Sequence, residues 1–465
     1  MVFSSISFVY YFLPITLLLY FIVPNKFKNF ILLLASLLFY FYGEPRYIII
    51  LIFSCIFNYY AGKLLEKQTK KTRKLILIID IIVNFGTLFY FKYFNFFLEN
   101  INYIFNTNFN LLNITMPIGI SFFTFQASSY VIDIYNKKIK SSSSLFNFAT
   151  YLSLFPQLIA GPIVRYETIE KNLNNRKVTA DLFTTGIKRF IVGLTKKVLI
   201  ANVLGEFSKN LANMTAKTVL SYWQQAISNM LQIYFDFSGY SDMAIGLGMM
   251  FGFEFLENFN YPFIAKSITD FWRRWHISLS SWFRDYVYIP LGGNRVNAVR
   301  RYLNILIVWM TTGLWHGASW NFILWGLYFA IILIIEKLFL LKFINKHRVI
   351  GHIYTIFLVL ISFIIFNTDN VKSIAIFLKS MFFLNNLKFS NLETIYYLKN
   401  YVGVLIVAII FSCPIFNTIK NKVPKNKTIT KILNILEPIT YILLLIICTA
   451  YIVDESFNPF LYFRF

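Results

Sequence analysis

The stretch LNILIVWMTTGLWHGASWNFILWGLYFAIILIIEKLFL, residues 303–340, decides the fold of this chain. It contains two apolar runs, Leu303–Leu314 and Trp320–Leu340, on either side of a short polar island. A helix that crosses a bilayer needs about 20 mostly apolar residues, so the longer run can span alone and the shorter one requires tilt or burial against other helices. His316 lies in the island between them, which places an ionisable side chain at membrane depth.

The composition of the whole chain extends this membrane interpretation. Of the 465 residues, 57% are hydrophobic and only 14% are charged, and the mean hydropathy is +0.60. Soluble domains carry about 25% charged residues, because even a large domain needs a polar surface. We therefore predict an all-α, polytopic membrane protein with a single membrane-embedded domain over residues 1–465.

Apolar runs recur along the chain and predict between about 9 and 12 membrane spans, with re-entrant or interfacial helices among them. The candidate segments, including those too short to cross alone, are Ile6–Val23, Phe30–Tyr42, Tyr47–Tyr60, Leu75–Phe97, Met116–Tyr135, Tyr151–Val164, Thr218–Phe237, Met243–Phe255, Leu303–Leu314, Trp320–Leu340, Ile350–Phe366, Tyr401–Phe416 and Ile432–Val453. We interpret the first run as a span and not as a cleaved signal peptide, because no small-residue cleavage site follows it.

The chain carries a formal net charge of +23, from 44 Lys and Arg against 21 Asp and Glu. It contains no helix-turn-helix, zinc-finger or RNA-binding motif, so we expect no nucleic-acid partner and attribute the charge to basic loops beside an anionic lipid surface. The segment Lys63–Lys74 holds six Lys and Arg against a single Glu. Placing that loop in the cytoplasm predicts that both chain termini lie outside.

A second polar segment, NYPFIAKSITDFWRRWHISLSSWFRDYVYIPLGG (residues 260–293), combines charges with tryptophans as no lipid-facing helix does. Each charge in hydrocarbon costs roughly 2.5–3.5 kcal/mol on insertion scales. The residues that recur at helical spacing are Trp272, Trp275, Leu279 and Trp282. We therefore predict one amphipathic helix that lies at the cytoplasmic interface or dips into a polar cavity. The competing interpretation is a surface helix that Trp and Arg anchor to the membrane.

The chain has four histidines. His276 and His316 lie in the two polar, Trp-rich segments. His347 and His352 lie in or beside a basic loop, and we expect them at the protein surface. An ionisable side chain inside a membrane domain is a candidate functional residue, because its burial is costly. The alternative for His316 is a ring that is satisfied by a backbone carbonyl of the bundle.

The chemistry available to His316 is that of a general base. A neutral imidazole can accept a proton from a hydroxyl as that hydroxyl attacks an acyl group. Gly313 and Gly317 flank the histidine and permit close approach of a ligand or of another backbone. No His, Asp and Glu set has metal-ligand spacing and no phosphate-binding glycine loop occurs, so we predict no metal site and no bound cofactor. Acyl transfer agrees with these residues, which do not by themselves fix the reaction.

Ordered motifs along the chain resemble the membrane-bound O-acyltransferase family, specifically its bacterial alginate O-acetyltransferase branch. The motifs are MPIGISFFTFQASSYVIDIY (Met116–Tyr135), FPQLIAGPIVRY (Phe155–Tyr166), YFDFSGYSDMAIGLGMMFGFEFLENFNYPF (Tyr234–Phe263), WRRWHISLSSWFRDYVYIPLGGNR (Trp272–Arg295), GLWHGASWNFILWGLY (Gly313–Tyr328) and NPFLYFRF (Asn458–Phe465). The resemblance spans most of the chain, and motifs of this length in this order are highly specific.

The resemblance implies many helices around a tunnel through a bacterial cytoplasmic (inner) membrane. A catalytic core at 116–330 would then lie between N-terminal spans (1–115) and C-terminal spans (331–465). His316 corresponds to the family's catalytic residue, which either activates the acceptor hydroxyl or relays the acetyl group. His276 corresponds to a second functional position on the cytoplasmic side of the tunnel.

The resemblance also implies an acyl donor on the cytoplasmic side, in this branch acetyl-CoA. Basic side chains near the inner mouth of the tunnel suit the phosphates of coenzyme A. The candidates for binding the donor or the substrate are Arg273, Arg274, Arg284, Trp315, Asp236 and Asn258. For the arginines, salt bridges to Asp270 or Asp285 are an equal alternative.

The implied activity is O-acetylation of an exported or cell-wall polysaccharide, with an SGNH-hydrolase-type partner outside the membrane that places the acetyl group on the polymer. Transfer of D-alanine to teichoic acids from a carrier-protein thioester is a sister reaction, although GPIVRY, SGYSDMAIGLG and YIPLGGNR resemble the acetylating branch more closely. A transporter is the alternative of another class, since broken spans and intramembrane charges suit one. No inverted repeat in the sequence supports it.

Overall fold

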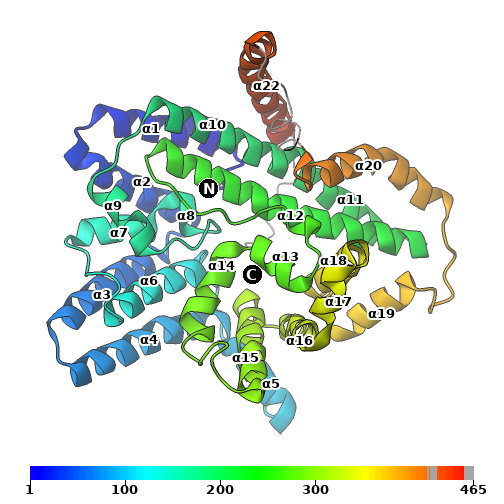
Figure 1. Ribbon diagram of the computed structural model, residues 1–465, viewed down its shortest axis with the longest axis horizontal. Coiled ribbons are helices and arrows are strands. Elements are labelled where there is room, and N and C mark those ends of the chain that lie inside the picture. The colour runs from blue at the N-terminus through cyan, green and yellow to red at the C-terminus, as the bar shows by residue number, and fades with distance from the viewer. Residues whose placement is uncertain (416–417, 419–426, 455–465) are drawn as a thin grey trace. The chain divides into compact units, whose positions relative to one another are not determined.

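The computed structural model describes residues 1–415, 418 and 427–454, which form helices and connecting segments with no β-strand among them (Figure 1). The all-α prediction is therefore confirmed. The motif NPFLYFRF (Asn458–Phe465) lies outside the described residues. The chain folds as two compact units, of which the first comprises Met1–Phe190 and Ser241–Leu256, and the second comprises Ile191–Tyr240 and the chain from Glu257 onward.

The first unit contains most of the N-terminal helices. Its elements are η1 (Ser7–Phe12), α1 (Leu13–Ile22), η2 (Asn25–Phe27), α2 (Lys28–Gly43), α3 (Ile48–Lys67), α4 (Lys70–Lys92), α5 (Phe94–Phe105), α6 (Ile120–Tyr135), α7 (Leu145–Ser153), α8 (Phe155–Leu158), α9 (Tyr166–Asn174) and most of α10 (Ala180–Thr195). Helices α3, α4 and α6 pack together within this unit (Figure 1). Because α6 is buried along nearly its whole length, it forms the centre of that group.

The second unit contains both polar, Trp-rich segments. Its elements are η3 (Lys196–Asn202), α11 (Val203–Ala212), the first part of α12 (Val219–Met250), η4 (Pro262–Ile264), α13 (Ile268–Arg274), α14 (Ile277–Phe283), η5 (Arg284–Tyr288), α15 (Ala298–His316), α16 (Trp320–Ile335), η6 (Glu336–Leu340), α17 (Leu341–Lys346), α18 (Arg348–Asn367), α19 (Val371–Met381), α20 (Leu392–Phe411) and α22 (Lys427–Asp454). The elements η3, η5 and η6 are π-helical turns, which are found frequently at functional sites.

Five of the described helices are long and apolar enough to cross a membrane, and the protein is a multi-pass membrane protein. They are α3, α4, α18, α20 and the segment Ile432–Asp454 of α22. The apolar helix Ser7–Ile22 is shorter. The total of about 9 to 12 spans stays a prediction.

Helix α12 differs from the sequence prediction. We predicted two segments, Thr218–Phe237 and Met243–Phe255, but residues 219–250 form one helix of 32 residues. The prediction of two separate segments was wrong, because the polar residues between the apolar runs, Asp242 among them, do not interrupt the helix. In the first unit that carboxylate is an ion-pair partner of Arg189, at 2.7 Å between Oδ1 and Nη2, so the helix continues through it.

Helices α15 and α16 pack directly against each other in the second unit (Figure 1). A Cβ atom on Gly313 would collide with the carbonyl oxygen of Phe322, and one on Gly326 would collide with that of Trp309. Small residues at a helix crossing let two backbones approach closely inside a membrane protein. The close approach predicted at Gly313 is confirmed, and it fixes the end of α15, where His316 lies.

Candidate active site

The segment predicted as one amphipathic helix is broken at His276. Helix α13 ends at Arg274 and helix α14 begins at Ile277, while His276 between them has left-handed backbone angles (φ 45°, ψ 54°). A non-glycine residue in this region costs of order 1–3 kcal/mol and persists only where the surroundings enforce it. Here the loop before η4 enforces it, because Asn260 N–H donates to Arg274 O (2.9 Å) and Ile277 N–H donates to Asn258 O (3.0 Å).

The turn buries the His276 ring, which is only 1% exposed. The Oδ1 atom of Asn258 lies 3.2 Å from His276 Nδ1 and accepts hydrogen bonds from Ser278 N–H and from the Ser278 hydroxyl (2.9 Å). An amide oxygen only accepts, so Nδ1 is the protonated ring nitrogen and the lone pair lies on Nε2. Burial lowers the pKa of His276 to about 3, and the ring is neutral at neutral pH.

His316 is the last residue of α15 and is 5% exposed. Its ring has edge contacts with Trp325 (4.9 Å between centroids) and Phe366 (5.2 Å). Trp315, the residue before His316, has its ring centroid 5.9 Å from that of the His276 ring. The structure thus brings His276, Trp315 and His316 into one aromatic cluster. Asn258 forms the hydrogen bond to the His276 ring at its polar side. The surface positions predicted for His347 and His352 are confirmed, since both are exposed.

A cavity of about 450 Å³ lies within the second unit, and residues of α13, α14 and α15 line it. Trp272 and Trp309 form part of its wall, and Trp272 contacts the Trp325 ring beside His316 at 5.6 Å. The indole Nε1 of Trp272 is buried and has no hydrogen-bond partner in the part of the chain that the structure describes. A buried donor left unpaired costs about 1–3 kcal/mol, so this N–H suits an acceptor atom of a ligand.

One face of α15 connects the cavity to His316. The cavity-lining residues Ile305, Val308, Trp309 and Thr312 follow the i, i+3, i+4, i+7 spacing of a single helix face. His316 is four residues beyond Thr312 and so continues the same face, about 6 Å further along the helix axis. A ligand extended along this face would therefore point its end toward the catalytic candidate.

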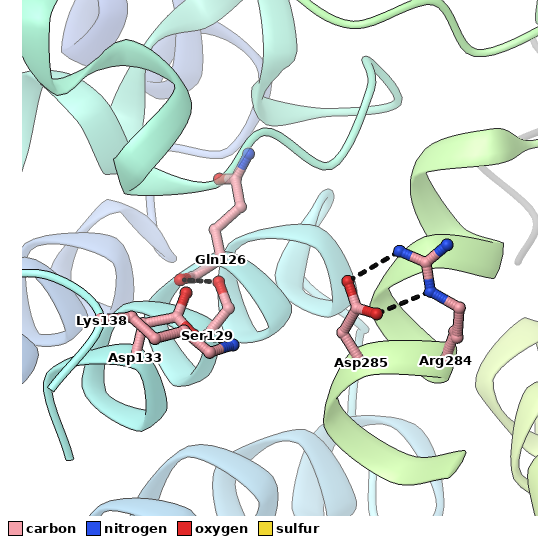
Figure 2. A network of polar contacts seen from close by, with 6 residues as sticks. All are labelled: Gln126, Ser129, Asp133, Lys138, Arg284 and Asp285. Carbon is pink, nitrogen blue, oxygen red and sulfur yellow. Dashed lines mark hydrogen bonds and ion pairs between the residues drawn. The ribbon is translucent and has the colours of Figure 1, made fainter. Parts of the chain in front are cut away.

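Three cations lie at the cavity: Arg273, Arg284 and Lys337. Lys337 Nζ donates to the Asn294 side-chain oxygen (2.6 Å), which also accepts from the Tyr288 hydroxyl (2.8 Å). Arg284 forms a bidentate pair with Asp285, with nitrogen–oxygen distances of 2.6 and 3.1 Å (Figure 2). Two π-helical turns thus supply charged groups to the cavity, since Arg284 begins η5 and Lys337 lies in η6.

The other two predicted binding residues, Arg274 and Asp236, form ion pairs away from the cavity lining. Arg274 Nε donates to Asp270 one helical turn earlier, at 3.0 Å. Asp236 accepts a hydrogen bond from Lys197 Nζ at 2.6 Å, in an ion pair whose two side chains are 2% and 4% exposed. Its neighbour Phe237 packs edge-on against the His276 ring at 4.6 Å, so this pair supports the aromatic cluster.

Glu336 is a functional candidate that the sequence reasoning missed. It is fully buried, and its carboxylate accepts hydrogen bonds from Ile268 N–H (2.6 Å), Thr269 N–H (2.9 Å) and the Thr269 hydroxyl (2.6 Å). A carboxylate at a helix N-terminus satisfies free N–H groups and is favoured by the helix dipole. Glu336 therefore fixes α13, which carries Trp272 and Arg273. The available signal was a lone carboxylate at the end of an apolar run.

We expect Glu336→Gln to lower the free energy of unfolding by about 1–3 kcal/mol, because an amide NH₂ group would face one of the buried N–H donors. Thermal unfolding in detergent measures this change, and Glu393→Gln, at an exposed position, is the matched control. Because Glu336 positions α13, Glu336→Gln should also raise the KM for the ligand of the cavity more than it lowers kcat. In Glu336→Asp, which keeps the carboxylate, the KM should return part of the way to the wild-type value. Equal unfolding temperatures for Glu336→Gln and the wild type would contradict this role.

Buried histidines and a cation-lined cavity in a polytopic helical protein are features expected of a membrane enzyme. The sequence profile of the membrane-bound O-acyltransferase family matches residues 47–373. The chain belongs to this family and is an acyltransferase.

Similar proteins include enzymes that act on different polymers. The chain is 39% identical to the probable alginate O-acetylase of Pseudomonas aeruginosa, over 88% of this chain and 80% of that protein. It is 35% identical to the peptidoglycan O-acetyltransferase of Helicobacter pylori, over 84% and 82%. The teichoic acid D-alanyltransferase of Bacillus subtilis is 32% identical, but over only 48% of this chain. The family assignment favours the acyltransferase hypothesis over the transporter.

Proposed function

We propose that the protein transfers acetyl groups from cytoplasmic acetyl-CoA for O-acetylation of an exported or cell-wall polysaccharide. The observation that carries this proposal is the cavity that three cations line and whose α15 face continues to His316. The similar proteins named for O-acetyl transfer cover far more of this chain than the D-alanyltransferase does. That difference supports acetyl transfer over D-alanyl transfer.

The cavity supports a donor that carries phosphates at one end and a thioester at the other. Arg273, Arg284 and Lys337 supply charge-assisted hydrogen bonds to phosphate oxygens. The arm of the donor would follow the face of α15 from Ile305 toward Thr312, where the lining is apolar. Coenzyme A has this distribution of charge, and its thioester would then lie next to His316.

In the proposed reaction, His316 accepts the proton of the attacking hydroxyl as the hydroxyl oxygen bonds to the thioester carbonyl carbon. The carbon–sulfur bond then breaks, and the sulfur leaves with a proton as the free thiol of coenzyme A. The unpaired indole N–H of Trp272 is suited to stabilise the negative charge that develops on the carbonyl oxygen. His276, neutral and held by Asn258, packs against Trp315 and orients the cluster.

The acceptor and the partner follow from the same proposal. A polysaccharide hydroxyl is the acceptor, and an SGNH-hydrolase-type protein outside the membrane completes delivery to the polymer. The protein would lie in the bacterial cytoplasmic (inner) membrane with both termini outside, and with the basic Lys63–Lys74 loop in the cytoplasm.

A deletion strain tests the proposed function. We expect the ester-linked acetate of envelope polymers to fall and to recover with the wild-type gene, while ester-linked D-alanine stays constant. Loss of D-alanine esters with unchanged acetate would instead identify the sister reaction. Unchanged levels of both esters would contradict an acyltransferase that modifies these polymers.

We expect Arg273→Gln and Lys337→Gln each to raise the KM for acetyl-CoA about tenfold, since a hydrogen bond to a charged group contributes about 1.5–3 kcal/mol. The KM for acetyl-pantetheine, which lacks the nucleotide phosphates, should not change. Lys342→Gln is the control, because Lys342 is exposed and does not line the cavity. An equal rise in KM for both thioesters would contradict phosphate binding at these residues.

A further inference from the structure

A second hollow, on the membrane-spanning helices of the first unit, has no role in the proposed reaction. It is an apolar groove of about 370 Å³ that residues of α3 and α4 line. Both helices are long and apolar enough to cross a membrane, and they pack against each other in the first unit (Figure 1). Side chains that line it include Phe53, Ile56, Tyr60 and Leu64 of α3, and Ile76 and Ile79 of α4. The small side chain of Ala61 also lines it and leaves the space between larger neighbours open.

The length of the groove matches one leaflet of a bilayer. From Phe53 to Leu64 the α3 helix rises roughly 16 Å, and half of a hydrocarbon core about 30 Å thick is about 15 Å. Phe53, Tyr60 and Leu64 are each about half exposed. An extended acyl chain would therefore fit the groove in both length and polarity.

The groove ends beside a cluster of cations. Helix α3 ends at Lys67 and α4 begins at Lys70, and Lys71 and Lys74 lie in the first turns of α4. All four lysines are exposed, and no hydrogen bond or ion pair engages them among the described residues.

The other charged side chains near the connection between α3 and α4 form hydrogen bonds with neighbouring segments of the first unit. Arg73 donates to the carbonyl oxygens of Ile134 and Tyr135, at 2.9 Å each, and so fixes the end of α6. Glu66 accepts from the backbone N–H and the hydroxyl of Ser141. The four lysines are therefore the groups left to bind an anion, while Arg73 and Glu66 are structural.

We propose that this groove and the four lysines form a binding site for an anionic phospholipid of the surrounding bilayer. One acyl chain lies between α3 and α4, and the phosphate-bearing headgroup lies against Lys67, Lys70, Lys71 and Lys74. The Tyr60 ring, about 10 Å from the end of α3, lies at the depth where amphipathic aromatic side chains favour the membrane interface. Basic residues beside an acyl groove recognise both parts of such a lipid, whereas an apolar protein helix would leave the lysines without a counterion.

Native mass spectrometry of the full chain, purified with equal amounts of phosphatidylglycerol and phosphatidylcholine of identical acyl chains, tests the site. We expect the wild type to retain phosphatidylglycerol about tenfold more than phosphatidylcholine, because each cation near an anionic lipid surface contributes to attraction. The variant with Lys67, Lys70, Lys71 and Lys74 all changed to Gln should lose this preference. A control variant with Lys372, Lys379, Lys388 and Lys399 changed to Gln, which removes the same charge from other exposed positions, should keep it.

The groove is tested separately with Ala61→Leu, which fills it, and with Ile56→Trp at its exposed rim in case the first variant does not fold. Either should reduce retention of both phospholipids at least fivefold. Equal retention of the two lipids by the wild type would overturn the proposal, as would an equal loss of preference in both lysine variants. The proposal would also be overturned if Ala61→Leu and Ile56→Trp left lipid retention unchanged. It would be overturned as well if the wild type were a dimer that these two variants dissociate, because the groove would then bind a second copy of the chain.

Discussion

Replacing His316 with glutamine should reduce the rate of acetyl transfer by about 10²- to 10⁴-fold, because this is the contribution of a positioned general base. Glutamine has similar length and polarity but cannot accept the hydroxyl proton. His316 lies at the end of α15, among the rings of Trp315, Trp325 and Phe366, so a smaller replacement would also leave a cavity. Release of the coenzyme A thiol at saturating acetyl-CoA and acceptor measures the effect on kcat.

His347→Gln is the matched control for this prediction. It makes the same chemical change at an exposed histidine of the second unit, so we expect the rate to remain within about twofold of the wild type. Both variants should unfold at similar temperatures, which separates lost chemistry from lost folding. A His316→Gln enzyme with wild-type kcat would remove His316 from the reaction.

The second large effect concerns stability. Lys197→Met should destabilise the protein by about 3–5 kcal/mol, because it leaves the Asp236 carboxylate buried without its cation. The thermal unfolding midpoint, followed by tryptophan fluorescence in detergent, measures the loss. Since Phe237 beside Asp236 contacts the His276 ring, activity should fall at temperatures below the unfolding transition as well.

The double variant Lys197→Met/Asp236→Leu separates charge from packing. Replacing both members of a buried ion pair with apolar residues is often neutral or stabilising, so we expect most of the lost stability to return. Lys138→Gln is the surface comparison, because its pair with Asp133 involves a half-exposed lysine and should contribute at most about 1 kcal/mol (Figure 2). A double variant less stable than Lys197→Met would contradict the account of this pair.

The sequence predicted the features that depend on composition and on local pattern. The apolar runs gave the all-helical membrane fold, and the isolated position of His316 between two such runs predicted its burial. Gly313 next to it predicted a close backbone approach, which α16 provides. Each of these conclusions required only neighbouring residues and the high cost of polar groups in lipid.

Features set by contacts between distant segments could not be predicted in this way. The Trp272 to Trp282 pattern has ideal helical spacing, yet the hydrogen bonds that Asn258 O accepts and Asn260 N–H donates force the left-handed turn at His276. Likewise, the role of Glu336 depends on the N-terminus of α13, which lies more than 60 residues earlier in the chain. The ion pairs of Arg274 and Arg284 with Asp270 and Asp285, and the positions of Arg273 and Arg284 in the cavity lining, likewise depend on the folded arrangement of several segments.

We propose that this chain transfers acetyl groups by means of His316. The most direct measurement places the purified protein in liposomes with acetyl-labelled acetyl-CoA, the proposed SGNH-hydrolase-type partner and an oligosaccharide acceptor. We predict labelled acetyl esters on the acceptor with the wild type and with His347→Gln, and a loss of about 10²-fold or more with His316→Gln. Equal labelling by the wild type and His316→Gln would contradict the claim, as would consumption of the thioester without any ester formed by the wild type.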